Sequence, residues 1–487
     1  MVDIEMLSGV RSVVVGLGRE GLALANYLSN HSLNVTGTDL RTETNLGNAL
    51  EALNSAGVPL VLGEHPLSLL DEADLLFVSP GVPLEAKFIQ QAIARKIPLC
   101  AESKLFCMLC PAPIVAITGS SGKTTTTTLV GKIMEATGRK TWVGGNIGQP
   151  LIGLVDQMTA DDVVVMELSS FQLEYFHARL NKDVDRDALP GKAPAALAQL
   201  LGNFSPQISA ILNITPNHLD RHPTMKHYVR AKRAIIDYQG RTGTIVMSLD
   251  NDMTRAVGNQ FGTKVQWFSL EAQPANGAGM VNDDLVLFDE NLKPQHLAHK
   301  SEIKLRGSHN LSNVLAACLL AREAGASIEA MHSVITSFSG VEHRLELVRQ
   351  YNQVTYYNDS ISTSPERLLA ALHSFNEPIV LLAGGRDKHL PWEEAAWLIL
   401  HKTRDVILFG ESSDLIAEFI EDTRDQVPTS KTVLHRVANL DEAVTLAAGS
   451  AQPGDVVLLS PGCASYDMFK DYVERGRQFK RLVMQLS

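Results

Sequence analysis

The stretch VAITGSSGKTTTTTLV, which runs from Val115 to Val130, joins an apolar run to a threonine-rich segment through a glycine loop. The usual phosphate-binding loop reads G-x-x-x-x-G-K-[ST], and its first glycine would fall here at Ile117. A chance cluster of glycines would explain Gly119 and Gly122, but not a Gly-Lys-Thr directly after an apolar run. The stretch therefore predicts a shortened phosphate loop between a buried strand and a helix, and with it an α/β fold.

Each residue type in this loop suits the phosphates of a nucleotide. Gly122 permits a tight turn whose backbone amides can surround phosphate oxygens, and Lys123 supplies a positive point charge. The hydroxyl of Thr124 is placed to ligate Mg²⁺. Glu167 ends the apolar run VVVME, where a buried carboxylate is costly unless it is paired or bound to a metal. We therefore predict that Glu167 holds Mg²⁺ beside the loop.

A further polar cluster follows the apolar run at 208–214. It consists of His218, Asp220, Arg221 and His222. We expect this cluster at the same sheet edge as Glu167, since the carboxyl ends of parallel strands share one edge. Tyr228 and Lys232 are four residues apart and share a helix face. From the residues alone, Lys232 is best interpreted as an ordinary surface lysine.

Short β-branched runs that end in glycine or a small polar residue alternate with helical segments along the whole chain. Near-continuous apolar strands of this kind imply parallel sheets that are covered by helices on both faces. We place domain boundaries near CPAP (Cys110–Pro113) and near SFSG (Ser337–Gly340). The segment 181–203 is charged and then rich in Pro, Gly and Ala, which indicates a surface insertion with a short helix.

The first domain carries a dinucleotide fingerprint. Gly16, Gly18 and Gly21 form G-x-G-x-x-G after the run Ser12–Val15, and Asp39 ends the next apolar run. The glycines let the backbone approach a pyrophosphate, and the acid can bind ribose hydroxyls. This pattern alone leaves three interpretations open: an NAD site, a site for another nucleotide diphosphate on a helix N-terminus, and a tight structural turn without a ligand.

Length and composition limit the class of protein. A chain of 487 residues predicts two or three domains, and a net charge of −11 gives no basic surplus with which to coat a nucleic acid. The N-terminus is acidic where a secretory signal is basic, and no apolar run is long enough to span a bilayer, so we expect a cytoplasmic protein. Cys107 and Cys110 form a C-x-x-C without a second pair at zinc spacing, so we interpret them as buried thiols.

A series of motifs recurs in one order along the chain. They are GSSGKTT, GGNIGQP (Gly144–Pro150), ELSSFQLE, NHLDRH, YVRAK, GSHNLSN (Gly307–Asn313), EHRLE (Glu342–Glu346), NDS (Asn358–Ser360) and GGRDK (Gly384–Lys388). Together they resemble the Mur ligase family, whose phosphate loop has the short form T-G-x-x-G-K-T. ELSSFQLE, GGNIG and the C-terminal SPGCASYDMF are similar to the family's D-glutamate-adding members. The resemblance covers nearly the whole chain, except for 181–203.

The resemblance implies three α/β domains. A Rossmann-like domain that binds a UDP substrate would cover residues 1–109. A central P-loop ATPase-type domain with a mainly parallel sheet would cover 110–340. A Rossmann-like C-terminal domain that binds the amino acid and ATP would cover 341–487. Three domains that converge on one reaction imply hinges near residues 110 and 340.

The resemblance also implies an ATP-dependent amide ligase of peptidoglycan precursor synthesis. Its substrates would be UDP-N-acetylmuramoyl-L-alanine and D-glutamate, with ATP and two Mg²⁺ ions, and with Lys232 carbamylated. ATP would phosphorylate the substrate carboxylate, and the amine would attack the acyl phosphate that forms. We expect a monomer that has no nucleic-acid partner and does not insert into a membrane.

Site residues follow from the motifs position by position. The residues implied at ATP are Gly119, Ser120, Ser121, Gly122, Lys123, Thr124, Thr125, Asn310, Asn313, Arg344 and Asp359. Those implied in catalysis are Lys123, Glu167, His218 and Lys232, and those at metal are Thr124, Glu167, His218 and the carbamate of Lys232. Those implied at the UDP substrate are Gly16, Leu17, Asp39, Gly81, Asn146, Ser169 and Gln172. Those implied at D-glutamate are Thr363, Lys388, Ser465 and Tyr472.

Three positions depart from the pattern of the family. Ile361 stands where a lysine is frequent, which removes a cation near the nucleotide and glutamate sites. Asn217 replaces a frequent aspartate before His218, and Tyr472 replaces a frequent phenylalanine. These departures concern the contacts with the substrates more than the class of reaction.

Four functions compete at this point. The first is the D-glutamate-adding ligase, and the second is a sister ligase or a folylpolyglutamate-type enzyme that adds another amino acid. The fingerprint with Asp39 favours a UDP substrate over a folate, because folate ligases lack that domain. The third is an NAD-dependent oxidoreductase, which leaves Lys123 and Glu167 unexplained. The fourth is a non-catalytic nucleotide-binding regulator, for which an intact Gly-Lys-Thr is awkward.

Overall fold

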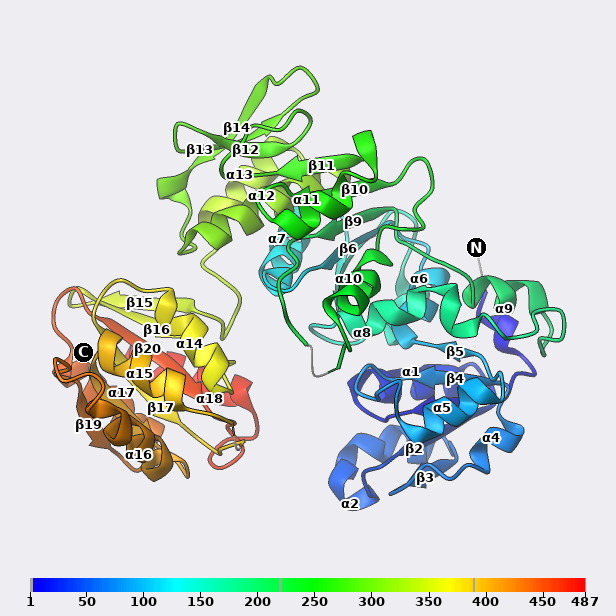
Figure 1. The fold of residues 1–487 in the computed structure, drawn as a ribbon, viewed down its shortest axis with the longest axis horizontal. Helices are drawn as coiled ribbons and strands as arrows, with labels where there is room; N and C mark the ends of the chain where they lie inside the picture. The colour runs from blue at the N-terminus through cyan, green and yellow to red at the C-terminus, as the bar shows by residue number, and fades with distance from the viewer. Residues whose placement is uncertain (1–2, 219–220, 389, 487) are drawn as a thin grey trace. The chain divides into compact units, whose positions relative to one another are not determined.

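The computed structural model describes residues 3–218, 221–388 and 390–486 (Figure 1). The chain divides into two compact units, one formed by Met1–Ile303 with Ser308–Ser337 and the other by Lys304–Gly307 with Phe338–Ser487. The first unit holds two sheets and the second holds one, and parallel strands predominate in all three. The predicted three-domain α/β class is confirmed, whereas the residue numbers of the domain boundaries stay predictions.

The first sheet is entirely parallel, with the strand order β3-β2-β1-β4-β5. Its strands are β1 Ser12–Val15, β2 Val35–Asp39, β3 Leu60–Leu62, β4 Leu75–Val78 and β5 Leu99–Cys100. Its helices are α1 Arg19–Asn30, α2 Glu43–Leu46, α3 Glu51–Ser55, α4 Leu69–Glu72, α5 Lys87–Ala94 and α6 Glu102–Leu109. The strand β1 is fully buried, as its run of valines predicts.

The glycine fingerprint closes the turn between β1 and α1. Gly16 has φ +87°, a region that L side chains rarely adopt. A Cβ atom on Gly21 would lie 2.0 Å from the carbonyl oxygen of Gly16. The glycines therefore let α1 start directly against the end of the strand, which puts its N-terminus at the carboxyl edge of the sheet.

The second sheet has nine strands in the order β14-β13-β12-β11-β10-β9-β6-β8-β7. It is parallel from β7 to β12, and β13 and β14 are added antiparallel. Its parallel strands are β6 Ile114–Thr118, β7 Thr141–Gly145, β8 Val163–Glu167, β9 Ile208–Ile211, β10 Thr244–Ser248, β11 Val265–Phe268 and β12 Ala278–Val281. The antiparallel strands are β13 Asp284–Phe288 and β14 Pro294–His299. The phosphate loop therefore follows a central strand, with the end of β8 beside it.

Helices cover this sheet and carry part of the site. They are α7 Lys123–Ala136, α8 Ser170–Leu173, α9 Pro194–Leu200, α10 Met225–Arg233, α11 Asp252–Gly258, α12 Ser308–Glu323 and α13 Ile328–Ser337. Thr125, Thr126 and Thr127 are buried at the start of α7. Tertiary packing thus holds a threonine-rich segment whose intrinsic helix propensity is modest.

The segment 181–203 contains the short helix that the sequence predicts, α9, but it is more than a surface excursion. Leu197 and Leu200 are buried in the core of the first unit. The side chain of Asn181 pairs with the backbone of Leu99 in β5, because Nδ2 donates to its carbonyl at 2.9 Å and Oδ1 accepts from its N–H at 2.8 Å. The segment is therefore bonded to the outermost strand of the first sheet.

The second unit contains a six-stranded sheet in the order β15-β16-β20-β17-β18-β19. All pairs are parallel except β15 with β16. Its strands are β15 Glu346–Tyr351, β16 Val354–Asn358, β17 Ile379–Gly384, β18 Thr403–Phe409, β19 Val433–Arg436 and β20 Val456–Gly462. Its helices are α14 Pro365–His373, α15 Glu393–Lys402, α16 Ser413–Arg424, α17 Leu440–Ser450 and α18 Tyr472–Gln485. An apolar core lies on each face, as expected for a Rossmann-like domain.

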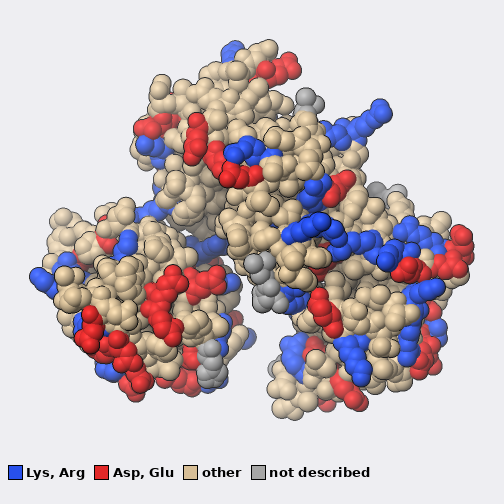
Figure 2. All heavy atoms as spheres, in the orientation of Figure 1, with Lys and Arg blue, Asp and Glu red and all other residues tan. Residues whose placement is uncertain are grey.

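Among the helices that the structure describes, none is both long enough and apolar enough to cross a bilayer. Figure 2 shows basic and acidic side chains on the visible face of each unit, with acidic side chains gathered on the second unit.

Candidate functional site

The phosphate loop has the backbone that its glycines predict. Gly122 has φ +80°, and a Cβ atom on it would lie 2.3 Å from Oδ1 of Asn313 on α12. Lys123 begins α7, and its Nζ donates to the carbonyl oxygens of Gly119 at 2.9 Å and Ser120 at 3.3 Å. The ammonium group therefore lies over the loop, where charged phosphate oxygens can take the place of these two neutral acceptors.

The loop is tied to the segment that follows β9. The backbone N–H of Ser121 donates to Oδ1 of Asn213 at 2.9 Å. The hydroxyl of Ser120 donates to the carbonyl oxygen of Thr215 at 3.0 Å and lies 2.9 Å from the hydroxyl of Tyr228. These bonds fix the loop to the segment after β9 and to α10.

Glu167 lies next to the loop, as predicted. Its carboxylate is buried, and it accepts from Oγ1 of Thr124 at 2.8 Å and from Nδ2 of Asn146 at 2.7 Å. The end of β8 and the first turn of α7 therefore bring a hydroxyl and a carboxylate into contact. Both are hard oxygen donors of the kind that Mg²⁺ prefers.

Lys232 is buried beside the loop, so its interpretation as an ordinary surface lysine is wrong. Its Nζ donates to the carbonyl oxygen of Gly119 at 2.8 Å and lies 4.6 Å from the ring centroid of Tyr228. Burial lowers the pKa of Lys232 well below its usual value, the nearby charge of Lys123 lowers it further, and Glu167 opposes the shift. The lysine faces inward because α10 packs that side against the loop.

An aromatic group surrounds the histidines after β9. His218 has φ +54°, and its ring meets Phe171 edge-on at 5.1 Å between centroids. His222 stacks on the same ring at 5.2 Å and contacts Oγ of Ser170 at 2.9 Å. Burial, and then the charges of His218 and Lys232, lower the pKa of His222 to about 4, so this imidazole is neutral near pH 7. Asp220 lies outside the described residues.

Only some of the predicted Mg²⁺ ligands suit the ion as they lie near the loop. Within the described ranges, no group of three or more His, Cys, Asp or Glu side chains lies close enough to hold a metal ion. Thr124 and Glu167 supply two oxygens, which suits an ion whose other ligands are water and phosphate. Lys232 as an ammonium is not a ligand, so it fits only after it loses its charge.

The predicted adenine-side residues lie beside the phosphate loop on α12. Asn313 is buried, and its Nδ2 donates to Oδ1 of Asn310 at 3.1 Å. The side chain of Asn313 also leaves no room for a Cβ atom at Gly122, so α12 packs directly against the loop.

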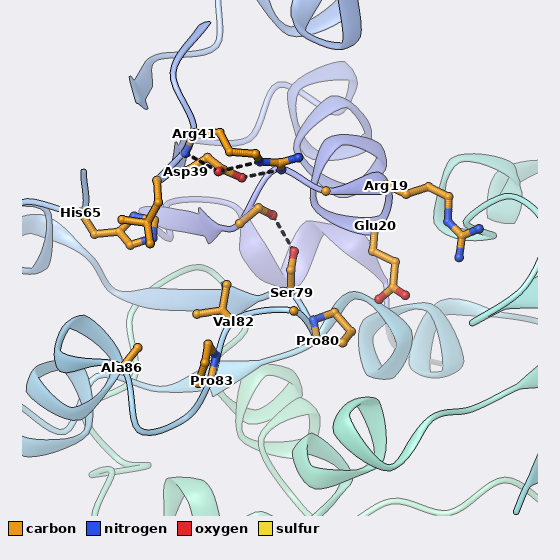
Figure 3. A pocket seen from close by; sticks show the side chains of 14 residues that line it. Arg19, Glu20, Asp39, Arg41, His65, Ser79, Pro80, Val82, Pro83 and Ala86 are labelled. Atoms are coloured by element: carbon orange, nitrogen blue, oxygen red, sulfur yellow. Dashed lines mark hydrogen bonds and ion pairs between the residues drawn. The ribbon is translucent and has the colours of Figure 1, made fainter. Parts of the chain in front are cut away.

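The first sheet carries a cavity of about 420 Å³ at the carboxyl ends of β1, β2 and β4 (Figure 3). Its lining includes Gly16, Asp39 and Gly81, three of the four residues predicted there for UDP. The fourth, Leu17, is buried and donates its backbone N–H to Oδ2 of Asp39 at 2.6 Å. The predicted residues are thus assembled around one concave site.

The carboxylate of Asp39 holds the guanidinium of Arg41 at the rim of this cavity. Its two oxygens accept from the backbone N–H of Arg41 at 2.8 Å and from the guanidinium at 3.0 and 2.8 Å. Burial raises the pKa of Asp39, but the bonds from Arg41 and Leu17 more than offset this and leave it below its usual value. Arg41 therefore presents a half-exposed positive charge to a ligand in the cavity.

A chain of hydrogen bonds links the cavity to the start of α8. Glu20 lines the cavity and accepts from Nε2 of Gln172 at 2.8 Å, while Oε1 of Gln172 accepts from the backbone N–H and hydroxyl of Ser169 at 2.8 and 3.0 Å. Ser169 caps α8 just after Glu167. The residues predicted to line the path of the substrate arm therefore connect the two sheets.

Sequence reasoning missed the residues that complete this connection. Arg19 extends from α1 and donates to the carbonyl oxygens of Gly148 at 2.6 Å and Asn146 at 3.1 Å. Burial raises the pKa of Glu20 to about 7, although the hydrogen bond from Gln172 opposes the rise. Burial also raises the pKa of Glu102 to about 8, and the nearby charge of Glu20 adds to that rise. In the sequence both acids look like ordinary first-turn residues of a helix, so no local signal marks them.

The second unit assembles a separate group of predicted residues. Nζ of Lys388 donates to Oγ1 of Thr363 at 3.1 Å. Asp359 is buried and accepts from the hydroxyl of Ser460 at 2.8 Å, and burial raises its pKa to about 7. Arg344 reduces that rise through its charge.

Two more predicted residues lie nearby in the same unit. The carbonyl oxygen of Tyr472 accepts from Oγ of Ser360 at 2.8 Å, and its ring meets His343 edge-on at 6.1 Å. Ser465 is buried. The carbonyl oxygen of Ile361 accepts from Nη1 of Arg367 at 3.0 Å, so a cation is bonded to this loop even though Ile361 carries none.

Three family descriptions match successive parts of the chain. The Mur ligase MurD-like N-terminal domain matches residues 10–101, the Mur ligase middle domain matches 117–188 and 192–321, and the Mur ligase glutamate ligase domain matches 343–463. The chain belongs to the Mur ligase family.

The relatives of this Mur ligase cover nearly its full length. A UDP-N-acetylmuramoylalanine–D-glutamate ligase of Symbiobacterium thermophilum is 41% identical and covers 98% of each chain. Proteins of the same name from Clostridium botulinum and Clostridium tetani are 38% and 36% identical, over 97% of this chain and 96% of theirs.

Solved structures support the fold of this Mur ligase. A UDP-N-acetylmuramate–alanine ligase from Thermotoga maritima matches with a TM-score of 0.56 at 17% identity, over 97% of this chain and 99% of the other. A UDP-N-acetylmuramoyl-L-alanyl-D-glutamate–2,6-diaminopimelate ligase matches with a TM-score of 0.54 at 16% identity, over 97% of this chain and 93% of the other.

Proposed function

We propose that this Mur ligase joins D-glutamate to UDP-N-acetylmuramoyl-L-alanine, with conversion of ATP to ADP and phosphate, in the synthesis of peptidoglycan precursors. The observation that carries the proposal is similarity over 97–98% of the chain to ligases of that name. The contact of Thr124 with Glu167 beside the Lys123 loop supports the ATP-dependent part of the reaction. We place this ATP-dependent step in the cytoplasm and propose that the enzyme acts as a monomer.

The reaction proceeds in two steps. An oxygen of the alanyl carboxylate attacks the γ-phosphorus of ATP, so an acyl phosphate forms and ADP leaves. The amino group of D-glutamate, which has given up its extra proton, then attacks the acyl carbon. The tetrahedral intermediate expels phosphate, and the nitrogen loses a second proton to become the amide. Both steps gather negative charge at one place, so the site must supply an opposing field.

The phosphate loop supplies that field. The backbone amides of Lys123–Thr125, in the first turn of α7, face the phosphates, and the Lys123 ammonium exchanges its bonds with the carbonyls of Gly119 and Ser120 for bonds with phosphate. Mg²⁺, when held by Thr124 and Glu167, would add positive charge next to the γ-phosphate. Asn310 and Asn313 lie at the adenine side of the loop.

We further propose that Lys232 is carbamylated. A neutral amine reacts with CO₂ to give a carbamate anion and a proton, and the lowered pKa of Lys232 favours the neutral amine. The resulting carbamate would offer an oxygen ligand to a second Mg²⁺, and His218 is the other residue that we propose for that ion. This change would also remove the repulsion between two neighbouring ammonium groups.

The cavity of the first sheet holds the uridine diphosphate part of the substrate. Gly16 lets the backbone approach the pyrophosphate, and Arg41 offers a charge at the rim. The muramoyl-alanine arm then follows Gln172, Ser169 and Asn146 toward Glu167, because those side chains form the connected path between cavity and loop.

The second unit carries the residues that we propose for the amino acid and two further residues that we propose for ATP. Lys388, with the hydroxyl of Thr363 beside it, binds a carboxylate of D-glutamate, and Ser465 and Tyr472 complete this subsite. Arg344 and Asp359 contact the phosphate and ribose of ATP.

An assay of ADP release with a panel of acceptors and amino acids tests the proposal. We expect ADP only when UDP-N-acetylmuramoyl-L-alanine and D-glutamate are both present. Release with another amino acid, or with a folate acceptor, would favour a sister ligase or a folylpolyglutamate-type enzyme. Oxidation of NADH without ADP release would favour the oxidoreductase.

A further inference from the structure

Two cations bind the same loop of the second unit. The loop between β16 and α14 contains Ile361 and Thr363, and it lies at the carboxyl edge of the sheet. Arg367, in the first turn of α14, donates from Nη1 to the carbonyl oxygen of Ile361 at 3.0 Å. Lys388, which follows β17, donates to the hydroxyl of Thr363 at 3.1 Å. The two side chains therefore reach positions only two residues apart on one loop.

The charges of these two side chains affect each other. Partial burial of the Lys388 ammonium lowers its pKa, and the positive charge of Arg367 lowers it further. Their hydrogen-bond partners in the described chain are a carbonyl oxygen and a hydroxyl, both uncharged. Arg367 also interacts electrostatically with the buried acid Asp359, whose pKa burial raises to about 7. Two cations that repel each other across neutral partners favour a ligand that brings more than one negative charge.

A third cation in this region has a different role. Arg475 is fully buried, and its guanidinium donates to Ser360 and to the carbonyl oxygen of Cys463 at 2.9 to 3.2 Å. Those bonds join the ends of β16 and β20, so Arg475 supports the sheet edge. Arg367, by contrast, is exposed and can turn to a ligand.

We propose that Arg367 is a specificity-determining residue for the incoming amino acid. Its guanidinium binds one carboxylate of D-glutamate and the Lys388 ammonium binds the other. This inference rests on the proposed function, because D-glutamate carries two carboxylates and one reacting amino group. With both carboxylates held, the amine is oriented, and an amino acid with a single carboxylate leaves one cation without its partner.

Kinetics of two variants test this role. Arg367→Gln should raise KM for D-glutamate about 10- to 100-fold, the worth of a charge-assisted hydrogen bond, and leave KM for ATP and for the UDP substrate within about twofold. Arg367→Lys should recover most of the loss. Arg436→Gln, which removes an exposed arginine paired with Asp414, serves as the matched control. An unchanged KM for D-glutamate in Arg367→Gln would overturn the inference.

Two substrate analogues identify the carboxylate concerned. D-norvaline lacks the side-chain carboxylate and 4-aminobutyrate lacks the α-carboxylate. If Arg367 binds one of these groups, the analogue that lacks it should lose no further kcat/KM when Arg367 is replaced. If replacement of Arg367 lowers kcat/KM for both analogues as much as it does for D-glutamate, the inference is overturned. If the wild type releases ADP with another amino acid and not with D-glutamate, the proposed function fails, and the same KM comparison with that acid decides the role of Arg367.

Discussion

The first unit contains two glycine loops of nearly the same design. Each follows a buried parallel strand, contains a glycine with positive φ, and opens a helix, α1 after Gly16 and α7 after Gly122. Their surroundings differ. The first loop borders a cavity with Arg41 at the rim and a buried acid, Glu20, behind it. The second has Lys123 over it.

In both places the loop supplies the shape of the site, and the neighbouring side chains supply its chemistry. Backbone amides at a helix N-terminus can bind phosphate in either place. Only the second loop has a lysine on the loop itself, a buried lysine behind it and a carboxylate that contacts a threonine hydroxyl. We therefore expect changes at the second loop to abolish turnover, and changes at the first to weaken substrate binding.

Removal of the lysine of the second loop should cause the greatest loss of activity. Lys123→Ala should lower ADP release about 1000-fold or more, because the charge that develops on the phosphates is no longer compensated. Lys132→Ala, at an exposed position of the same helix, is the control. Near-normal turnover in a folded Lys123→Ala protein would contradict the assignment of the second loop as the reactive one.

The buried lysine Lys232 lies behind the second loop and should respond differently from Lys123. Lys232→Ala should lower turnover about 100-fold or more, and a small carboxylate such as acetate should restore part of it, because it replaces the anion of the carbamate. The same carboxylate should not help Lys123→Ala, in which a cation is lost. Absence of rescue across a concentration series would count against carbamate chemistry. Lys226→Ala, exposed on α10, should behave like the wild type.

A change at the rim of the cavity that the first loop borders should act on binding alone. Arg41→Gln should raise KM for the UDP substrate about 3- to 10-fold, because one charged donor at the cavity rim is lost, and leave KM for ATP within about twofold. Arg11→Gln breaks a similar arginine–aspartate pair outside the cavity lining and is the matched control. A fall in kcat with unchanged KM would show that the two loops do not divide the work in this way.

The smallest expected effect concerns the buried acids behind the first loop. The folded chain raises the pKa of Glu20 to about 7 and of Glu102 to about 8, so from about pH 4.5 to 8 it binds more protons than the unfolded chain. Stability should therefore fall as the pH rises through that window. Glu102→Gln should remove part of this fall and raise the melting temperature by about 2–6 °C at pH 8, with a smaller gain at pH 5.

The exposed acid Glu135 on α7 gives the control for this measurement. Glu135→Gln should leave the pH dependence of the melting temperature as it is in the wild type. A gain from Glu102→Gln that is equal at pH 5 and pH 8 would show that ionisation of the buried pair is not its cause.

The sequence predicted the fold and much of the site because the signals are local. An apolar run followed by glycine, as at Val115 to Gly119, predicts a strand end, and parallel strands bring such ends together. Thr124 and Glu167 therefore meet as predicted, although they are far apart in the chain. The sequence shows that Ile361 stands where a lysine is frequent. It does not show that Arg367 places a cation at the same loop, because that contact depends on how α14 begins.

Tertiary packing decides what the sequence could not show. The residues around Lys232 do not distinguish an inward from an outward face of α10, and only the family resemblance pointed to the site. Arg19 and Glu102 belong to helices of the first sheet and contact segments of the second, and no local sequence pattern predicts such contacts. The ion-pairing of Asp39 with Arg41 was likewise invisible, because an acid at a strand end can meet either a ribose or a cation.

The two hydrogen bonds between Asn181 and Leu99 protect an edge strand of the first sheet, β5. The terminal strand of an open sheet offers unpaired amide and carbonyl groups to any other extended chain, which is a route to aggregation. Asn181 occupies both groups of Leu99 with one side-chain amide. The inserted segment thus blocks this edge of the sheet from pairing with a strand of another molecule.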